Sequence, residues 1–187
     1  MGAMAIEGGA TDAELVRSVL DGDRAAFGEL YDRYARFVRA ICYDTTRNVP
    51  DARDMAQEAF LRAYRGLGDL RRPDRFAAWL TAIARTLCRQ WCRSRSREMS
   101  RRRDVEPAEM EAPASDPANN GLAPLHRALM ALPERERLAV QAFYLLDQSR
   151  DQARAALNLS RSGLYRLLQR ARGRLKRLLA EDREDLT

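Results

Sequence analysis

The sequence has few of the residues that build metal centres and disulfide frameworks. Its 187 residues include one histidine, His126, and three cysteines, Cys42, Cys88 and Cys92. A structural zinc site needs about four ligands of these types, and a small disulfide scaffold needs a denser cysteine pattern. We therefore expect no metal, no cofactor and unpaired thiols. With one histidine, no nucleophile motif and no glycine-rich phosphate loop, the sequence gives no support to an enzyme or to any catalytic residue.

Long apolar runs are also missing. No stretch approaches the ~20 apolar residues that cross a bilayer, and the start of the chain has no signal-peptide pattern. We interpret the first residues, "MGAM", as a cloning remnant ahead of a native Met4. Valine-rich alternation of apolar and polar residues, which is typical of strands, does not occur. These absences predict an all-α cytoplasmic protein that does not insert into a membrane.

The residues that are abundant indicate a packed, cationic protein. Apolar residues make up 45% of the chain, and the net charge of +6 favours a polyanionic partner. Apolar residues recur at spacings of three and four nearly throughout, as on the buried face of a helix. The stretch "EPAEMEAPASDPANNG" interrupts this pattern, because it holds too few apolar residues to fold alone. We predict a helical bundle at 10–97 and a helix-turn-helix domain at 122–182, joined by a flexible acidic linker at 98–121.

Polar residues mark where several helices begin. Thr11, with Glu14 three residues later, has the pattern of a capping box, in which each side chain accepts from the other residue's backbone N–H. Asp51 is a candidate N-cap of a later helix. Towards the C-terminus, Ser160 is placed to cap a helix, and Asn158 is suited to a left-handed turn just before it.

The segment 161–179 combines an apolar stripe with many basic residues and no acidic one. The apolar positions repeat at spacings of three, four and seven: Leu164, Leu167, Leu168, Ala171, Leu175, Leu178 and Leu179. A helix at 150–157, a turn at 158–160 and this basic helix have the layout of a helix-turn-helix, whose second helix enters the DNA major groove. A helix with a merely solvated cationic face remains the alternative. A membrane-surface helix is disfavoured, because the apolar side carries small aliphatic residues and only Tyr165 as an aromatic.

In combination, the two blocks resemble the extracytoplasmic-function (ECF) group of bacterial RNA polymerase sigma factors, in the sigma-70 family. The resemblance covers roughly residues 12–97 and 122–180. "AFGELYDRYARFVRAICY" resembles the opening helix of the group, and "FAAWLTAIARTLCRQWCRSRSR" resembles the helix that meets the −10 promoter element. "ALPERERLAVQAFYLL" resembles the start of the domain that reads the −35 element. The resemblance implies an alternative sigma factor that binds core RNA polymerase and directs promoter recognition, melting and transcription initiation.

The segment "DARDMAQEAFLRAYRGL" resembles the part of these proteins that binds the polymerase clamp. The resemblance implies the following polymerase-binding residues: Asp51, Asp54, Gln57, Glu58 and Leu61. On a helix, the last four of these lie on one side, which suits docking to a partner helix pair. From the spacing alone, a solvated helix face with Asp51 acting only as a cap is an equal alternative.

The loop "LGDLRRPDR" resembles the family loop that captures an unpaired promoter base. Together with the helix after it, the resemblance implies these −10 DNA-binding residues: Arg71, Arg72, Arg75, Trp79, Arg85, Thr86 and Arg89. Arginines hold backbone phosphates, and tryptophan offers a stacking face to a base. Trp79 also fits an apolar stripe with Phe76, Leu80 and Ile83, and a place in the core is the interpretation that this spacing favours.

In the basic helix, the resemblance implies these −35 DNA-binding residues: Ser162, Tyr165, Arg166, Gln169, Arg170 and Arg172. The chain departs from the family pattern at several points. Tyr165 occupies a position where a basic residue is usual, and the first helix has Arg150 where an aromatic is common. Ala153 and Arg154 replace the usual apolar and small pair at its centre. We therefore expect this first helix to pack more weakly or in a shifted register. For the same reason, we do not transfer a promoter preference from the family to this chain.

The partners implied by the resemblance are core RNA polymerase, promoter DNA and an anti-sigma protein that masks the binding faces. Two alternatives remain at the level of the sequence. One is a helix-turn-helix regulator that binds DNA or RNA and never engages polymerase. The acidic helix that resembles the clamp-binding segment argues against this alternative. The other is an interaction protein with a degenerate DNA reader, which the residues at the centre of the first helix make slightly more credible.

Overall fold

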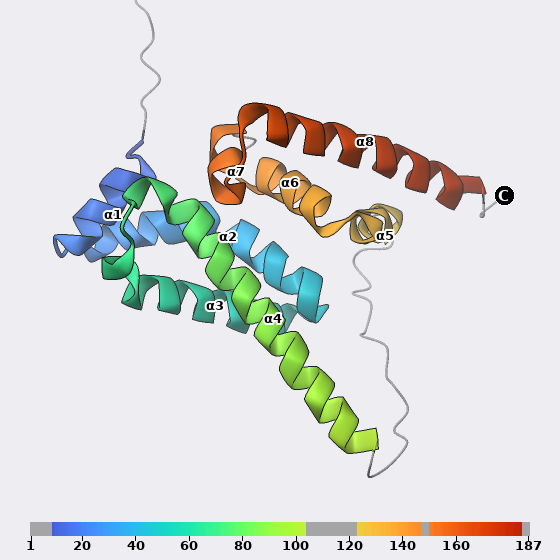
Figure 1. The fold of residues 1–187 in the computed structure, drawn as a ribbon, viewed down its shortest axis with the longest axis horizontal. Coiled ribbons are helices and arrows are strands. Elements are labelled where there is room, and N and C mark those ends of the chain that lie inside the picture. Colours follow the sequence, from blue (N-terminus) through green and yellow to red (C-terminus); the bar gives the residue numbers. More distant parts are fainter. Residues whose placement is uncertain (1–8, 104–122, 147–149, 185–187) are drawn as a thin grey trace, which may run out of the picture.

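The computed structural model describes residues 9–103, 123–146 and 150–184, so most of the predicted linker lies outside the described residues (Figure 1). Within these ranges the chain forms α-helices and short 3-10 turns and no strand, which confirms the predicted all-α class. The helices are α1 (Asp12–Leu20), α2 (Arg24–Thr46), α3 (Val49–Arg65), α4 (Phe76–Arg103), α5 (Ala123–Ala131), α6 (Glu134–Leu145), α7 (Arg150–Leu157) and α8 (Arg161–Glu184). The 3-10 turns η1 (Leu67–Asp69) and η2 (Pro73–Arg75) connect α3 to α4.

Local capping explains where the first helices begin. The predicted capping box of α1 is confirmed: the Thr11 backbone N–H donates to Glu14 Oε2 at 2.7 Å, and the Glu14 N–H donates to Thr11 Oγ1 at 3.3 Å. The prediction that Asp51 caps α3 is wrong. Asn48 is the N-cap, and its side-chain oxygen accepts from the Asp51 N–H at 3.0 Å. Proline is tolerated in the first helical turn, so α3 begins ahead of Pro50 and leaves Asp51 inside that turn.

The first helical part is built from α1 to α4, with α4 running across α2 and α3 (Figure 1). Large side chains from these helices and from η1 fill its core: Val16, Leu30, Tyr34, Phe37, Val38, Leu67, Phe76 and Leu80 are almost completely buried. Alanines on the inner side of α3 let that helix approach α2 closely: Ala52, Ala56, Ala59 and Ala63. The core therefore fixes α4 against α2 and α3. The predicted domain end at residue 97 falls inside α4, which continues to Arg103.

The second part contains α5 to α8, and α8 runs alongside α5 and α6 (Figure 1). The helix-turn-helix layout is confirmed: Asn158 has the left-handed φ of 52°, and Ser160 Oγ accepts from the Gly163 N–H at 3.1 Å. The atypical first helix packs through two small side chains, Ala153 and Ala156, both of which are buried. On α8, Leu164, Leu167 and Ala171 are buried, whereas the predicted burial of Leu168 is only partial.

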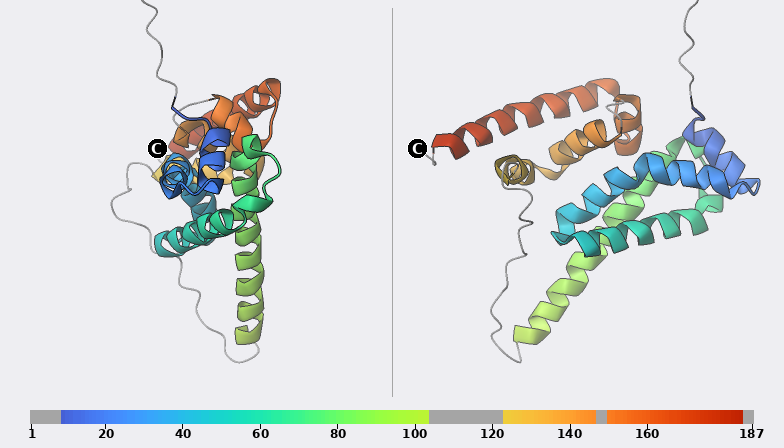
Figure 2. Two further views of the ribbon diagram at one scale, coloured as in Figure 1. Left: turned by 90° about the vertical axis from the view of Figure 1, so that its left-hand side faces the viewer. Right: turned by 180° about the vertical axis from the view of Figure 1, so that it is seen from behind.

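The two parts are in contact. α7 packs against α4, and α6 packs against α2, as both views in Figure 2 show. The buried apolar residues of α6 and α7 join those of α2 and α4 in one continuous cluster. Among the described residues, no helix has the length and apolar character needed to cross a membrane.

Candidate polymerase and nucleic-acid interfaces

The outer side of α3 presents the predicted polymerase-binding residues together. Asp54, Gln57 and Leu61 are exposed, and Glu58 is close to half exposed. Glu58 Oε1 accepts from Arg62 Nε at 2.6 Å, an exposed i,i+4 pair that contributes little to stability. Asp51 lies one turn earlier and is partly buried. The same helix places Ala59 and Ala63 in the core, so the polar face is held on a fixed support.

An aromatic cluster borders this face, and the sequence interpretation did not include it. Tyr31 and Tyr64 are each about two-fifths exposed, beside the exposed Leu61. The Tyr31 ring packs on Phe60 with 4.6 Å between centroids, and Tyr64 packs edge-on against Phe27 at 4.9 Å. The position of Tyr31 in the sequence does not indicate a contact with α3. Only the packing of α2 against α3 brings these rings together. The face therefore combines acidic groups with apolar surface.

The turns between α3 and α4 form a basic hollow of about 500 Å³. Its lining includes the predicted residues Arg71, Arg72, Arg75 and Trp79, together with Asp69, Leu70, Ala78 and Asn158. Arg72 binds Asp74 through two contacts, Nη2 to Oδ2 at 2.8 Å and Nε to Oδ1 at 3.3 Å. This guanidinium holds the pKa of the Asp74 carboxyl below its usual range. Arg71 is exposed, so the hollow keeps an accessible positive charge.

Trp79 serves both the core and the hollow. It is partly buried and packs against the core, with 6.2 Å between its ring centroid and that of Phe76. One edge of the indole lies over Gly66, where an added Cβ would stand 3.5 Å from a ring carbon. Trp79 is also one of the residues that line the basic hollow. The two interpretations of Trp79 are therefore compatible, since the side chain packs on the core and also borders the hollow.

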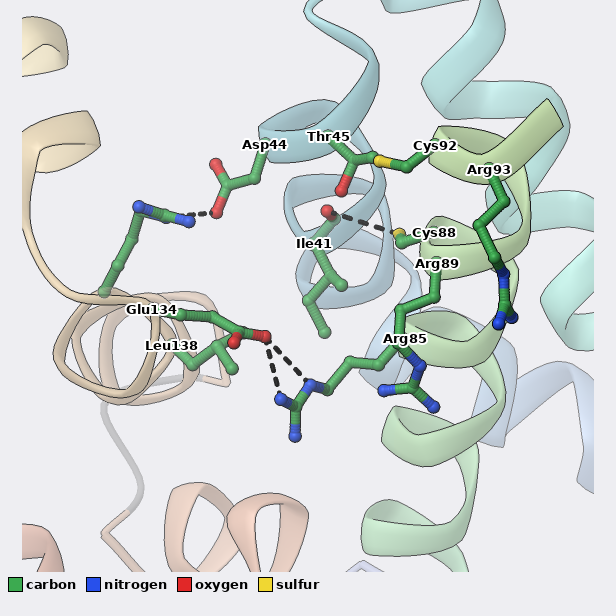
Figure 3. Close-up of a pocket in the computed structure, with 11 residues that line it drawn as sticks. Ile41, Asp44, Thr45, Arg85, Cys88, Arg89, Cys92, Arg93, Glu134 and Leu138 are labelled. Atoms are coloured by element: carbon green, nitrogen blue, oxygen red, sulfur yellow. Dashed lines mark hydrogen bonds and ion pairs between the residues drawn. The ribbon is translucent and has the colours of Figure 1, made fainter. Parts of the chain in front are cut away.

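Of the other predicted residues of α4, Arg85 and Arg89 lie on its side facing α6. Thr86 Oγ1 donates to the Ala82 carbonyl at 2.8 Å and accepts from Arg89 Nη2 at 2.9 Å. Arg85 reaches across to Glu134 of α6, with Nη2 to Oε1 at 2.8 Å (Figure 3). Arg85 and Arg89 line a pocket of about 410 Å³ between α2, α4 and α6, which also contains Arg93. α4 thus carries three arginines at spacings of four along one side.

Two thiols meet beside this pocket. Cys42 is fully buried, and its hydrogen bond with Cys88, together with burial, raises the pKa of its thiol. Hydrogen bonds from Cys42 and Thr45 lower the pKa of Cys88 to about 7. Cys88 also lines the pocket that contains Arg85, Arg89 and Arg93. Cys92 is exposed, and all three cysteines are free thiols.

The outer face of α8 presents the predicted −35 residues, all of them exposed. Tyr165 and Gln169 are joined, with Gln169 Nε2 donating to the tyrosine hydroxyl at 2.8 Å. A hollow of about 710 Å³ runs along this face and includes Arg166, Gln169 and Arg170. Ser162, Tyr165, Arg166 and Gln169 follow one another on the side opposite the buried Leu164, Leu167 and Ala171, as a groove-reading surface requires.

Glu136 of α6 restrains two arginines of α8, which the sequence did not indicate. Its side chain is 6% exposed, and Oε2 lies 3.1 Å from Arg174 Nε. The Nε of Arg170 is farther, 3.9 Å from Glu136 Oε1. A buried carboxylate needs such partners, because an unpaired buried charge is costly. Arg170 and Arg174 are therefore turned towards α6, whereas Arg166 makes no ion pair within the described part of the chain.

Comparisons with known proteins agree with this arrangement. Residues 30–98 match the Sigma-70 region 2 family. The ECF RNA polymerase sigma factor SigM of Mycobacterium tuberculosis H37Rv is 32% identical over 170 residues, which are 90% of this chain and 85% of that protein. RfaY of Xanthomonas campestris, described as a probable RNA polymerase sigma factor, is 34% identical over 167 residues. That alignment includes 86% of this chain but only 42% of RfaY, so the chain spans less than half of that relative.

Solved structures give the same result for the fold. CnrH, in complex with the cytosolic domain of CnrY, superposes with a TM-score of 0.64 and 26% identity, over 91% of this chain and 98% of CnrH. The sigma factor RpoE of Bartonella quintana, in complex with the anti-sigma factor NepR, superposes with a TM-score of 0.55 over 82% of this chain and 96% of RpoE. Its identity of 24% supports the fold alone. Because the 32% identity to SigM extends over 90% of this chain and 85% of that protein, the chain belongs to the ECF RNA polymerase sigma factors of the sigma-70 family.

Proposed function

We propose that this ECF sigma factor divides its work among three faces: α3 binds the polymerase clamp, the η1–η2 hollow and α4 bind the −10 element, and α8 reads the −35 element. As a sigma factor it is a non-catalytic protein that binds RNA polymerase and directs promoter recognition and initiation. The observation that carries the assignment is a separation of charge. Asp54 and Glu58 lie on the outer side of α3, where Glu58 pairs with Arg62, whereas the turns between α3 and α4 and the outer sides of α4 and α8 expose mainly arginines.

The assignment of each face follows from the chemistry of its proposed partner. DNA is a polyanion, and arginines that neutralise its phosphates release condensed counterions and so favour binding. Promoter melting by this protein needs no ATP, because binding energy for the unstacked strand offsets the cost of opening, roughly a few kcal/mol per extruded base. The partly exposed Trp79 beside Arg71 and Arg75 offers such an unstacked base both a ring and positive charge. The outer face of α3 combines charges of both signs with the exposed side chains of Leu61 and Tyr64, which suits a protein partner better than DNA.

The assigned function also implies a cellular location and a mode of regulation. A protein that works on chromosomal promoters acts in the bacterial cytoplasm, which is where we place this chain. CnrH and RpoE were solved with CnrY and with the anti-sigma factor NepR, respectively. We propose that a comparable anti-sigma protein controls the present chain. The domain limits that go with this assignment are 10–97 for the −10 and polymerase-binding part and 122–182 for the −35 part.

The test of the proposal is transcription in vitro. Purified core RNA polymerase with and without this protein is incubated with a genomic DNA library, and the transcript starts are mapped. The expected result is a set of new starts that share −10 and −35 sequences and that depend on the added protein. Binding to duplex DNA without any association with core polymerase would instead identify a helix-turn-helix regulator.

We expect Trp79→Leu to weaken binding of the holoenzyme to a single-stranded −10 oligonucleotide by about 1–3 kcal/mol, because leucine fills the core position but offers no ring for stacking. Trp79→Phe is the matched control and should stay close to the wild type, since it keeps an aromatic face. Fluorescence anisotropy measures both affinities. If the Leu and Phe variants bind equally well, Trp79 has only a packing role.

We expect Arg166→Ala to cost about 1–3 kcal/mol on the cognate −35 site and to relax the preference at one base pair, because an outward arginine can bind guanine O6 and N7. Lys176→Ala, in the same helix, should weaken binding to all sequences alike and make the salt slope shallower by about one unit. A salt titration on cognate and scrambled duplexes separates these effects. Equal losses of Arg166→Ala on both duplexes would limit Arg166 to phosphate contact.

A further inference from the structure

Two cysteine side chains meet inside the joint between α2 and α4, within the first helical part. Cys42 of α2 is fully buried, Cys88 of α4 is 7% exposed, and both belong to the continuous apolar core. Their thiols are hydrogen-bonded to each other. Cys88 Sγ also lies 3.8 Å from the carbonyl oxygen of Ile41, the residue just before Cys42 (Figure 3). The two sulfur atoms are therefore neighbours, although α3 separates their helices in the chain.

Cys88 is the thiol of this pair that small molecules can reach. It lines the pocket of about 410 Å³ beside α4, whereas Cys42 lies behind it in the core. The hydrogen bond with Cys42, followed by one with Thr45, lowers the pKa of Cys88 to about 7. At neutral pH about half of these thiols are therefore charged, against a few per cent of an ordinary cysteine. The thiolate is the nucleophilic form, so Cys88 is the reactive member of the pair.

The pocket beside Cys88 suits a small polar oxidant. Arg89 and Arg93 line it, and guanidinium groups can donate hydrogen bonds to the oxygen that leaves when a thiolate attacks a hydroperoxide. The Asp44 carboxylate, which also lines the pocket, opposes a charge on Cys88. Arg137 Nε lies 2.7 Å from Asp44 Oδ2 and offsets that negative charge. The surroundings therefore allow both a thiolate and the anionic oxygen that its reaction releases.

The third cysteine, Cys92, is not placed to pair with Cys88. It is exposed and lies four residues further along α4. Side chains at this spacing on a helix have Cβ atoms about 5–6 Å apart, whereas a disulfide requires about 3.5–4.5 Å. A bond between Cys88 and Cys92 would therefore distort α4. Cys42 comes from a different helix and already contacts the Cys88 thiol, so it is the partner that the fold provides.

We propose that Cys88 and Cys42 form a reversible thiol switch for hydroperoxides, in which oxidation ties α4 to α2 through a disulfide. The Cys88 thiolate attacks one hydroperoxide oxygen, the O–O bond breaks, and the leaving oxygen takes up the proton that the thiol had released. Cys88 is then a sulfenic acid. The Cys42 thiol attacks the Cys88 sulfur, the S–O bond breaks, and the Cys42 proton leaves with the hydroxide as water. Two thiols are oxidised and one hydroperoxide is reduced.

The position of Cys42 makes the oxidation reversible and stabilising. A sulfenic acid that meets no thiol is oxidised further to the sulfinic acid, which is a largely irreversible product. Cys42 prevents this by condensing with Cys88, and low-molecular-weight thiols then reduce the disulfide by exchange. The disulfide also restricts the unfolded chain between α2 and α4, so the oxidised protein is more stable than the reduced one.

The first test is treatment of the reduced full-length chain with hydrogen peroxide, followed by alkylation of the remaining thiols and peptide mass spectrometry. The expected product is a peptide joined through Cys42 and Cys88, which dithiothreitol separates again. Cys92→Ala is the matched control, since it removes the exposed thiol, and it should give the same joined peptide. A joined peptide that contains Cys92, or oxidation of Cys92 alone, would contradict the proposed pair.

The second test assigns the order of the two thiols. In Cys42→Ala, peroxide should stop at the Cys88 sulfenic acid, which dimedone labels, and no joined peptide should form. In Cys88→Ala, dimedone should leave Cys42 unlabelled. Circular dichroism checks that both variants keep the helical content of the wild type, as expected for alanine in place of a small buried thiol. Dimedone on Cys42 instead of Cys88 would overturn the proposed order.

The third test measures the tie between the helices. Oxidation should raise the melting temperature of the wild type by about 5–15 °C, the size expected when a disulfide closes a loop of this length in a chain of this size. Dithiothreitol should reverse the rise, and peroxide should cause none in Cys42→Ala. A joined peptide with an unchanged or lower melting temperature would mean that the folded joint does not accommodate the bond, and the tie would be wrong.

Discussion

Phe76→Ala is expected to lower the free energy of unfolding by about 3–5 kcal/mol, a large share of the stability of a small domain. The ring is fully buried at the first residue of α4, with its centroid 5.9 Å from that of Tyr34 and 6.2 Å from that of Trp79. Alanine would leave a cavity where α4 meets α2, and Trp79 would lose the neighbour that positions it. Urea unfolding followed by circular dichroism measures the change.

The control for this variant is Leu20→Ala at the end of α1. Leu20 is 51% exposed, so its truncation should change the free energy of unfolding by no more than about 0.5 kcal/mol. At a temperature where Phe76→Ala remains folded, we also expect weaker binding to single-stranded −10 DNA in the holoenzyme. A loss of stability below about 1 kcal/mol would mean that the core around α4 can repack, contrary to the tight burial described here.

The double variant Asp54→Lys/Glu58→Lys is expected to weaken binding to core RNA polymerase by about 100-fold or more, because like charges across a complementary interface cost several kcal/mol. Both side chains lie on the outer face of α3, and neither is needed by the core. Helical content should therefore stay nearly unchanged. Affinity is measured by titrating labelled variant with core polymerase, and transcript yield at limiting protein should fall in parallel.

Asp21→Lys/Asp32→Lys is the matched control, with the same change of net charge at exposed positions away from α3. It should bind core polymerase with nearly the affinity of the wild type. If the α3 variant and this control bind equally well, the polymerase-binding role of α3 is wrong. A parallel loss in both would point to net charge rather than to a docking face.

Much of the candidate site could be predicted because it depends on neighbours a few residues apart. The capping box of Thr11, the left-handed turn at Asn158 and the cap at Ser160 are local hydrogen-bonding choices, and helical periodicity places Leu164 and Leu167 on the buried side of α8. The same periodicity put the −35 residues on the exposed side. Asn48 and Asp51 are both residue types that favour the N-cap position of α3. The sequence pattern alone therefore predicted the wrong N-cap.

The sequence by itself determined the all-α class, the helix-turn-helix and the faces of charge, since these follow from spacing along one helix. Only the tertiary structure decided which charges are paired. Asp44 and Arg137 are 93 residues apart, and Glu136 meets Arg174 across two helices. In a chain with 33 basic and 27 acidic residues, each charge has many possible partners, and the partner is selected by which helices pack together and which side chains lose water. Packing therefore turned Arg170 towards Glu136, left Arg166 facing outward, and placed Arg85 against Glu134.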